Sequence, residues 1–272
     1  MHPSGFITLT SDFGSDSPYI AAMKGVILTM CPTARIFDLC HNIEPQNVTA
    51  GALTLEDVAA LYPPGTVHIA VIDPGVGTNR KILLAQIGDY FYIAPNNGLL
   101  DRVIRQAEKT KTSMAFYSLD RSEYWRESIS NTFHGRDVMA PVAAHLLSGR
   151  IPSDLGVKLP IGSIVRLNIS EPKITPTTAT GIIESIDSFG NLISNIRLSD
   201  IKGRPLDDSV TISLSSSIIS QGVYRTYADK PVGSVIAIID SIQRVEIAVV
   251  NGCAAKTLNA SVGDEVVLTW RQ

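Results

Sequence analysis

An acidic and a basic residue bracket a short loop rich in glycine. Asp73 and Arg80 lie at the two ends of the segment PGVGTN, which can fold back and bring its ends together. The pair could be an ordinary structural salt bridge, and Asp73 could also organise the turn. Alternatively, the guanidinium fixes the carboxylate and holds it ionised, as a catalytic base or a water-positioning group requires. The spacing alone leaves both interpretations open.

A histidine precedes a stretch with helical periodicity. The motif HGRD begins at His134 and is followed by apolar residues at helical spacing, so we expect His134 at the N-terminus of a helix. The positive field there would favour neutral imidazole. A lone histidine is more often structural or solvated. With His41, Asp12 and Asp73 it could also bind a metal, but no HExxH-like pattern lies on one element, and we expect no metal site.

Two further groups of polar residues could bind a ligand. Asp12 directly follows a predicted buried strand, where a carboxylate is costly without partners, and a bidentate acceptor there would suit a vicinal diol such as a ribose. Asp187 and Asn191 lie in IDSFGN between two apolar strands, which first indicates a hairpin turn. They could also present a carboxylate and an amide to a zwitterionic amino acid.

The first half of the chain alternates strand and helix patterns, which predicts an α/β domain with a mostly parallel sheet flanked by helices. Ligands of such folds collect beyond the carboxyl ends of the strands, where Asp12 and Asp73 occur. A hairpin and another helix follow. The expected elements are strands at Phe6–Thr10, Arg35–Leu39 and Val67–Ile72, helices at Tyr19–Met30 and Val48–Leu61, hairpin strands at Ile82–Ile87 and Tyr90–Ala94, and a helix at Leu99–Glu108.

The last third of the chain has a different pattern. Short Ile/Val-rich segments separated by turn residues predict an all-β domain, a small barrel or sandwich. The segment EPKITPTT, rich in proline and threonine, precedes them and predicts a linker. We therefore expect an α/β domain at 1–170, a linker at 171–178 and a β-barrel domain at 179–272.

Composition excludes several classes of protein. The 272 residues carry 23 Lys+Arg and 26 Asp+Glu, a net charge of −3, which argues against a nucleic-acid binder. Hydrophobic residues make up 44% of the chain, yet no apolar run reaches the roughly 20 residues of a membrane helix. The first residues lack the pattern of a signal peptide, so we expect a cytoplasmic protein without membrane contact. The three cysteines form no CxxC pair and are expected to be reduced and buried.

Several motifs in one register, spanning the chain from about Gly5 to its end, resemble the S-adenosyl-L-methionine (SAM) hydrolases, also called SAM hydroxide adenosyltransferases, which are related to fluorinase and chlorinase enzymes. The motifs are SDFG at Ser11–Gly14, MKG at Met23–Gly25, DPGVG at Asp73–Gly77, YIAPNNGLL at Tyr92–Leu100, FHGRD at Phe133–Asp137, FGN at Phe189–Asn191 and EIAV at Glu246–Val249.

The resemblance implies an α/β domain, a β-barrel domain and a homotrimer that binds SAM between the first domain of one subunit and the second domain of its neighbour. It also implies that Asp73, Arg80 and His134 surround the attacking water, and that Asp12 binds the ribose. Contacts to methionine and adenine would fall on five residues: Asp187, Asn191, Ser241, Glu246 and Val249. SAM would be the substrate, and no cofactor is implied.

Two departures bear on the function. Ile242–Arg244 stands where relatives more often have an aromatic, glycine-containing stretch, which affects the adenine end. Halogenating relatives carry Tyr and Thr in the loop at Asp73–Gly77 and a long insertion after it, whereas this chain has acidic Asp73 and Val76 and no insertion. A carboxylate beside the reacting carbon would repel a halide. A halogenase and a non-catalytic SAM- or adenosine-binding module remain the alternatives to a hydrolase.

The chemistry expected from this resemblance is a one-step displacement. Water held by Asp73 and His134 attacks C5′ of SAM opposite the sulfur, which leaves as neutral methionine thioether, while Arg80 holds Asp73 ionised. Bulk water, with a pKa of about 15.7, would need metal-like help to become hydroxide first. Proton removal should therefore follow bond formation, and either Asp73 or His134 could accept the proton.

Overall fold

The protein is described here by a computed structural model that covers residues 2–271. The chain forms two compact units, one up to Leu167 and one from Asn168 onward. An α/β unit is followed by an all-β unit, so the predicted fold class is confirmed. Strand β8, Lys173–Ile174, lies within the expected linker and pairs with β9 of the second unit.

The first unit is built on a seven-stranded mixed sheet in the order β2-β1-β3-β5-β4-β6-β7. The strands from β2 to β5 run parallel to their neighbours, and the pairs from β5 to β7 are antiparallel. The bounds are β1 Phe6–Ser11, β2 Arg35–Cys40, β3 Val67–Val71, β4 Ile82–Ile87, β5 Tyr90–Pro95, β6 Met114–Ser118 and β7 Val157–Leu159.

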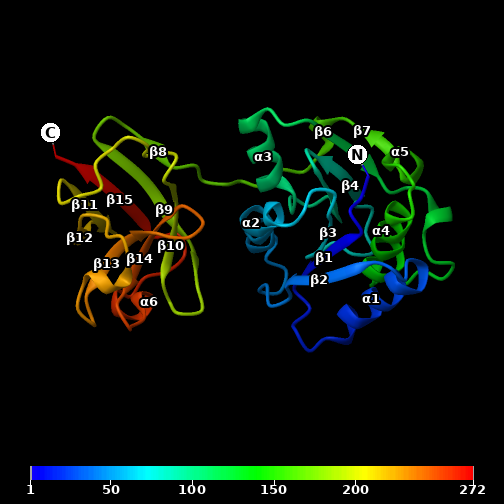
Figure 1. Ribbon diagram of the computed structural model, residues 1–272, viewed down its shortest axis with the longest axis horizontal. Helices are drawn as coiled ribbons and strands as arrows, with labels where there is room; N and C mark the ends of the chain where they lie inside the picture. The colour runs from blue at the N-terminus through cyan, green and yellow to red at the C-terminus, as the bar shows by residue number, and fades with distance from the viewer. Residues whose placement is uncertain (1, 272) are drawn as a thin grey trace. The chain divides into compact units, whose positions relative to one another are not determined.

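Helices cover both faces of this sheet (Figure 1). Side chains alternate across a strand, so Ile69 of β3 faces the core with α1 and α4, whereas Ala70 faces the core with α2 and α3. Helix α1 begins after the Ser17 cap, with Pro18 in its first turn. The helices are α1 Pro18–Met30, α2 Val48–Val58, α3 Asp101–Thr110, α4 Ala140–Leu147 and α5 Pro152–Leu155.

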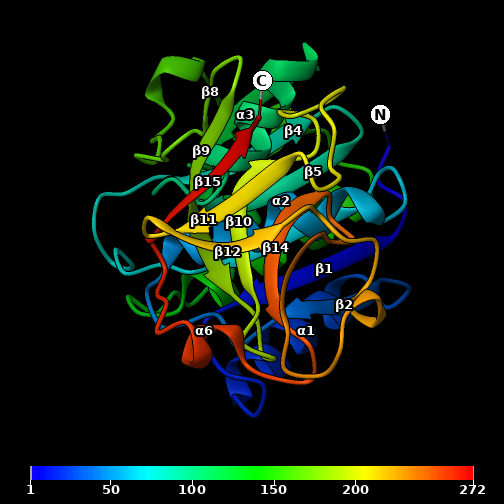
Figure 2. The same ribbon diagram turned by 90° about the vertical axis from the view of Figure 1, so that its left-hand side faces the viewer.

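The second unit is an antiparallel sheet in the order β12-β11-β15-β9-β10-β14-β13, with β8 beside β9. Figure 2 looks onto strands β9, β10, β11, β14 and β15 of this sheet. The strands at the two ends of the order, β12 and β13, contact each other, so the sheet nearly closes into a barrel. The remaining bounds are β9 Thr178–Ile186, β10 Leu192–Arg197, β11 Val210–Leu214, β12 Ser217–Gln221, β13 Val235–Ile239, β14 Arg244–Val249, β15 Glu265–Trp270 and the short helix α6 Ala254–Thr257.

Each unit buries apolar side chains in a core of its own. Within residues 2–271, no helix is both long and apolar enough to span a bilayer. All three cysteines are free thiols, as expected; Cys31 is buried, whereas Cys40 and Cys253 are only partly so.

Candidate active site

The loops after two neighbouring parallel strands line a cavity of about 240 Å³ in the first unit. Asp12 follows β1 and Asp73 follows β3 by two residues, so both lie at the carboxyl edge of the sheet. His134 lines the same cavity from the start of a π-helical turn, Gly135–Met139, that leads into α4. The predicted helical position of His134 is confirmed, and the three side chains share one cavity.

Arg80 joins the two reactive groups of this cavity. Its Nε lies 2.8 Å from both carboxylate oxygens of Asp73, and its Nη2 also donates to Asp73 Oδ2. The same Nη2 lies 3.0 Å from Nδ1 of His134. The side chains of Asp73 and Arg80 are 5% and 10% exposed, so the pair is shielded from solvent. The guanidinium thus holds the carboxylate and the imidazole in one hydrogen-bonded group.

The loop between Asp73 and Arg80 closes because its glycines permit it. Gly77 has φ +80°, and a Cβ there would lie 2.6 Å from the carbonyl oxygen of Asn131. The Thr78 hydroxyl donates to the Gly75 carbonyl at 2.7 Å, which stabilises the turn. A side chain at position 77 would therefore disturb both the turn and the approach of the segment at Asn131.

The contact with Arg80 fixes the tautomer of His134. A guanidinium nitrogen can only donate hydrogen bonds, so Nδ1 of His134 is the acceptor. The neutral ring then carries its proton on Nε2. Burial lowers the pKa of His134, and the Arg80 charge lowers it further, against the smaller opposing effects of Asp73 and Asp137. Neutral imidazole was expected from a helix N-terminus; here burial and Arg80 produce it.

The turn that carries His134 is held by a buried carboxylate. Asp137 is fully buried and accepts hydrogen bonds from Arg136, from Arg126 and from the backbone N–H of Ser130. Burial alone would raise the pKa of Asp137, but these hydrogen bonds outweigh it and lower the pKa. The turn and the preceding loop are therefore tied together.

Close packing also positions this turn. A Cβ on Gly135 would lie 3.3 Å from Met23 Sδ and from Val71, so the glycine lets the turn approach α1 and β3. Next to it, the rings of Phe13 and Phe133 meet edge to face with centroids 5.9 Å apart, and both line the cavity. The carboxylates and the imidazole thus face an apolar aromatic wall.

Asp12 has one oriented oxygen. Its Oδ2 accepts a hydrogen bond from the backbone N–H of Gln46 at 2.8 Å, and Gln46 adopts φ +66° and also lines the cavity. This contact supplies a partner that the carboxylate needs. No hydrogen bond to the second oxygen, Oδ1, occurs within residues 2–271, so this atom can accept one from a ligand.

The alternative of a metal site formed by Asp12, His41, Asp73 and His134 finds no support in the geometry. No cluster of three His, Cys, Asp or Glu side chains suited to a metal occurs among the described residues. His41 is engaged elsewhere: its Nδ1 lies 2.7 Å from the Ser11 hydroxyl, and its Nε2 is 3.0 Å from Asp38 Oδ1 without hydrogen-bond geometry.

The remaining predicted site residues belong to the second unit. A cavity of about 640 Å³ is lined by Asp187, Asn191, Ser241 and Glu246. Asp187 Oδ1 accepts the backbone N–H groups of Phe189 and Asn191, and Asn191 Nδ2 donates to Asp187 Oδ2 at 3.1 Å. Asp187 therefore organises the hairpin turn and also faces a cavity, so the two interpretations of this motif are compatible.

Glu246 is the most buried carboxylate of this second cavity. It is 4% exposed and accepts a hydrogen bond from the Tyr227 hydroxyl at 2.6 Å. Burial raises the pKa of Glu246, and repulsion from Asp240 and Asp187 adds to the increase, against the opposing effect of Tyr227. Val249 does not line the cavity, because its side chain packs in the barrel core.

Sequence reasoning missed three residues that shape these cavities: Gln46, Arg225 and Tyr227. Tyr227 begins a short 3-10 turn that is capped reciprocally by Thr226 and Asp229. The spacing of Thr226 and Asp229 was the available signal for that turn, but nothing local indicates that the tyrosine reaches a glutamate 19 positions further along the chain.

Comparison with known proteins places both units in one family. The model of the SAM hydroxide adenosyltransferase N-terminal domain matches residues 7–156, and that of the C-terminal domain matches residues 181–267. The (R)-S-adenosyl-L-methionine hydrolase of Salinispora tropica is 32% identical over 99% of both chains. A fluorinase of Nocardia brasiliensis is 30% identical over 72% of both.

A solved structure also matches this chain over nearly its full length. The crystal structure of an uncharacterized conserved protein from Thermotoga maritima superimposes with a TM-score of 0.87 and 32% identity, and covers 97% of this chain and 99% of that one. Since both family models match, in order, and the relatives match over nearly the full length, the chain belongs to the SAM hydroxide adenosyltransferase family.

Proposed function

We propose that this protein hydrolyses S-adenosyl-L-methionine to adenosine and L-methionine by in-line attack of water on C5′. Family membership supports this function, as do relatives named (R)-S-adenosyl-L-methionine hydrolase that match over almost the whole chain. The proposal rests on one observation: the Arg80 guanidinium binds both Asp73 and His134. These two residues line a cavity together with Asp12.

The two groups beside Arg80 take different roles in this mechanism. His134 has its proton on Nε2, and no residue in the described chain accepts a hydrogen bond from that atom, so it can donate to the oxygen of a bound water. Asp73 is the hydrogen-bond acceptor, because a carboxylate bound by a guanidinium keeps lone pairs for the water protons. In this proposal Asp73 receives the proton as the C–O bond forms, and the contact between Arg80 and His134 supports that choice over His134.

Positioning supplies most of the rate in this mechanism. A carboxylate has an ordinary pKa of about 4 and bulk water one of about 15.7, so no side chain of this site generates hydroxide before attack. Well-oriented groups can lower a barrier by about 7–11 kcal/mol. The sulfonium leaving group needs no protonation, because it departs as a neutral thioether.

The second cavity suits the cationic parts of the substrate. Asp187, Asp240 and Glu246 bring negative charge to it, and the raised pKa of Glu246 reflects their mutual repulsion after the effect of burial. An ammonium group of the methionine moiety would relieve that repulsion. Asn191 and Ser241 add neutral polar groups for the rest of the substrate. The proposed contact with Val249 could use only its backbone, since the side chain lies in the core.

We further propose a homotrimer in which the first unit of one subunit and the second unit of its neighbour complete the substrate site. The division of the candidate residues between two cavities supports this assembly. The domain limits 1–170 and 179–272 and the cytoplasmic location stay predictions. SAM is the substrate here, and the proposal assigns no cofactor.

Fluorinase is the second candidate, because fluorinase relatives match 72% of the chain. Asp73 weighs against it. This carboxylate is part of the cavity lining, and it would repel a halide at the position where a nucleophile must approach C5′.

Isotope labelling tests the reaction. After incubation with SAM and EDTA in 18O-labelled water, we expect one 18O atom in the 5′-hydroxyl of adenosine and none in methionine, measured by mass spectrometry. A parallel reaction with added chloride or fluoride should give the same adenosine. Unlabelled adenosine would rule out direct attack by water, and a 5′-halo-adenosine would identify a halogenase.

Substitutions test the assigned roles. Asp73→Asn and His134→Ala should each lower kcat by about 10²–10⁴-fold with a smaller change in KM, since both groups act on the water. The matched control is Asp154→Asn in α5, which makes the same chemical change outside the cavity and should retain wild-type kcat. Near-normal turnover of the Asp73 and His134 variants would remove these residues from the mechanism.

The lowered pKa of His134 sets the acid limb of the pH–rate profile. Neutral His134 accepts from Arg80, whereas protonated His134 cannot, so activity belongs to the neutral form. Because the pKa of His134 lies below the ordinary value of 6.5, the midpoint of the acid limb of kcat/KM should lie below pH 6.5. An acid limb centred above pH 6.5 would contradict this assignment.

Mixing two inactive variants tests the shared site. Asp73→Asn and Asn191→Ala subunits, refolded together in equal amounts, should recover about a quarter of wild-type activity if each site uses one unit from each of two subunits in a closed ring. Each variant refolded alone serves as the control. A fully active monomer in analytical ultracentrifugation, or no recovery on mixing, would refute the proposed assembly.

A further inference from the structure

Besides its catalytic cavity, the first unit has another cavity, of about 260 Å³, on the face of the sheet that α2 and α3 cover. It reaches the turn between β4 and β5, at Gly88–Asp89. Since β5 runs parallel to β3, this turn lies at the edge where β3 begins, whereas Asp73 follows the end of β3. No described residue lines both this cavity and the catalytic one, so the two are separate.

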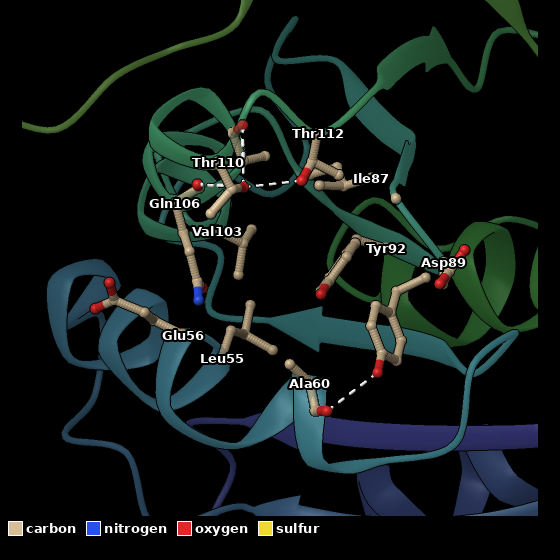
Figure 3. Close-up of a pocket in the computed structure, with 13 residues that line it drawn as sticks. Leu55, Glu56, Ala60, Ile87, Asp89, Tyr92, Val103, Gln106, Thr110 and Thr112 are labelled. Atoms are coloured by element: carbon tan, nitrogen blue, oxygen red, sulfur yellow. Dashed lines mark hydrogen bonds between the residues drawn. The ribbon is translucent and has the colours of Figure 1, made fainter. Parts of the chain in front are cut away.

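The wall of this cavity is mainly apolar. Figure 3 shows Leu55 of α2 and Val103 of α3 facing the space from one side, with Ala60 below. Neither lysine nor arginine lines it, among the residues described, while the carboxylates of Glu56 and Asp89 stand at its margin. Glu56 is already paired with Arg102 at 3.1 Å. This chemistry disfavours an anion and suits a neutral molecule with a large apolar part.

Tyr92 places a hydroxyl group, without a hydrogen-bond partner among the described residues, at this apolar space. The residue is 3% exposed, and Figure 3 shows its hydroxyl directed between Leu55 and Val103. Within residues 2–271 the hydroxyl forms no hydrogen bond. Burial raises the pKa of Tyr92, with a smaller contribution from Tyr90, so the phenol stays protonated and can donate. The hydroxyl faces the cavity, so it can donate to an acceptor of a ligand that enters it.

Two neighbouring hydroxyl groups, those of Tyr90 and Thr110, already have hydrogen-bond partners within the protein. The Tyr90 hydroxyl donates to the carbonyl oxygens of Ala60 and Tyr62, at 3.0 and 3.1 Å. The Thr110 hydroxyl donates to the Gln106 carbonyl at 2.9 Å. The ring of Tyr92 is held by His68, which stacks on it with centroids 5.0 Å apart. The Tyr92 hydroxyl therefore has a fixed position and can donate a hydrogen bond to a ligand in the cavity.

We propose that this cavity is a second, non-catalytic binding site for a small neutral aromatic molecule that carries a carbonyl oxygen. The ring lies among Leu55, Val103 and Ala107, and the oxygen accepts a hydrogen bond from Tyr92. The site is independent of SAM hydrolysis, since its lining contains none of the residues assigned to that reaction.

The test compares acetophenone with α-methylstyrene, a near-isostere in which a CH₂ group replaces the carbonyl oxygen. Each probe is titrated into the full chain with 13C-labelled methyl groups, and binding is followed through the methyl signals of Leu55 and Val103. We expect saturable shifts of both signals with acetophenone. Tyr92→Phe should weaken acetophenone binding by about 3- to 10-fold, the effect of one hydrogen bond, and leave α-methylstyrene within about 2-fold.

The matched control is Tyr90→Phe, which removes a hydroxyl that is already bonded within the protein and should leave the preference between the probes unchanged. Tyr92→Phe removes no internal hydrogen bond, so its Tm should equal or exceed that of the wild type. The proposal is overturned if acetophenone shifts neither methyl signal at its solubility limit. Equal weakening of both probes by Tyr92→Phe would overturn it as well.

Discussion

One guanidinium determines the arrangement of the catalytic cavity. Arg80 binds both oxygens of Asp73 and the Nδ1 atom of His134, so two groups from distant parts of the chain are oriented by a single side chain. The same contact decides which nitrogen of the imidazole carries the proton. A lysine could supply the charge, but not the planar array of donors that meets two acceptors at once. The distinct roles proposed for the acid and the histidine depend on this geometry.

The fold supplies the conditions for that contact. Parallel strands β1 and β3 end at one edge of the sheet, which brings Asp12 and Asp73 together. The buried Asp137 and the close approach of Gly135 to β3 fix the turn that carries His134. Hydrogen bonds to backbone or guanidinium groups orient Asp12, Asp73 and Asp137, so little reorganisation is needed when water and substrate enter.

The sequence predicted the elements with strong periodicity, and it failed where structure depends on partners distant in the chain. Strand β6 is stabilised by pairing with β4 on one side and β7 on the other, and none of this is visible locally. Strand β12 follows a tight turn in which Ser215 and Ser216 both have positive φ, a role that Asn-Gly usually signals, so nothing local in this serine-rich segment predicts the turn.

The same limit applies to the sites. Spacing paired Asp73 with Arg80, and only the family resemblance added His134 to them. The direction of a hydrogen bond is a property of coordinates, and only that direction separates a donor histidine from a base. Tyr227 is a residue that the sequence did not indicate at all. Its hydroxyl donates to Glu246, whose pKa is raised by burial and by acidic neighbours. Such a partner becomes visible only when the barrel brings distant strands together. Sequence thus defines which groups are present, whereas the fold defines the state in which each group acts.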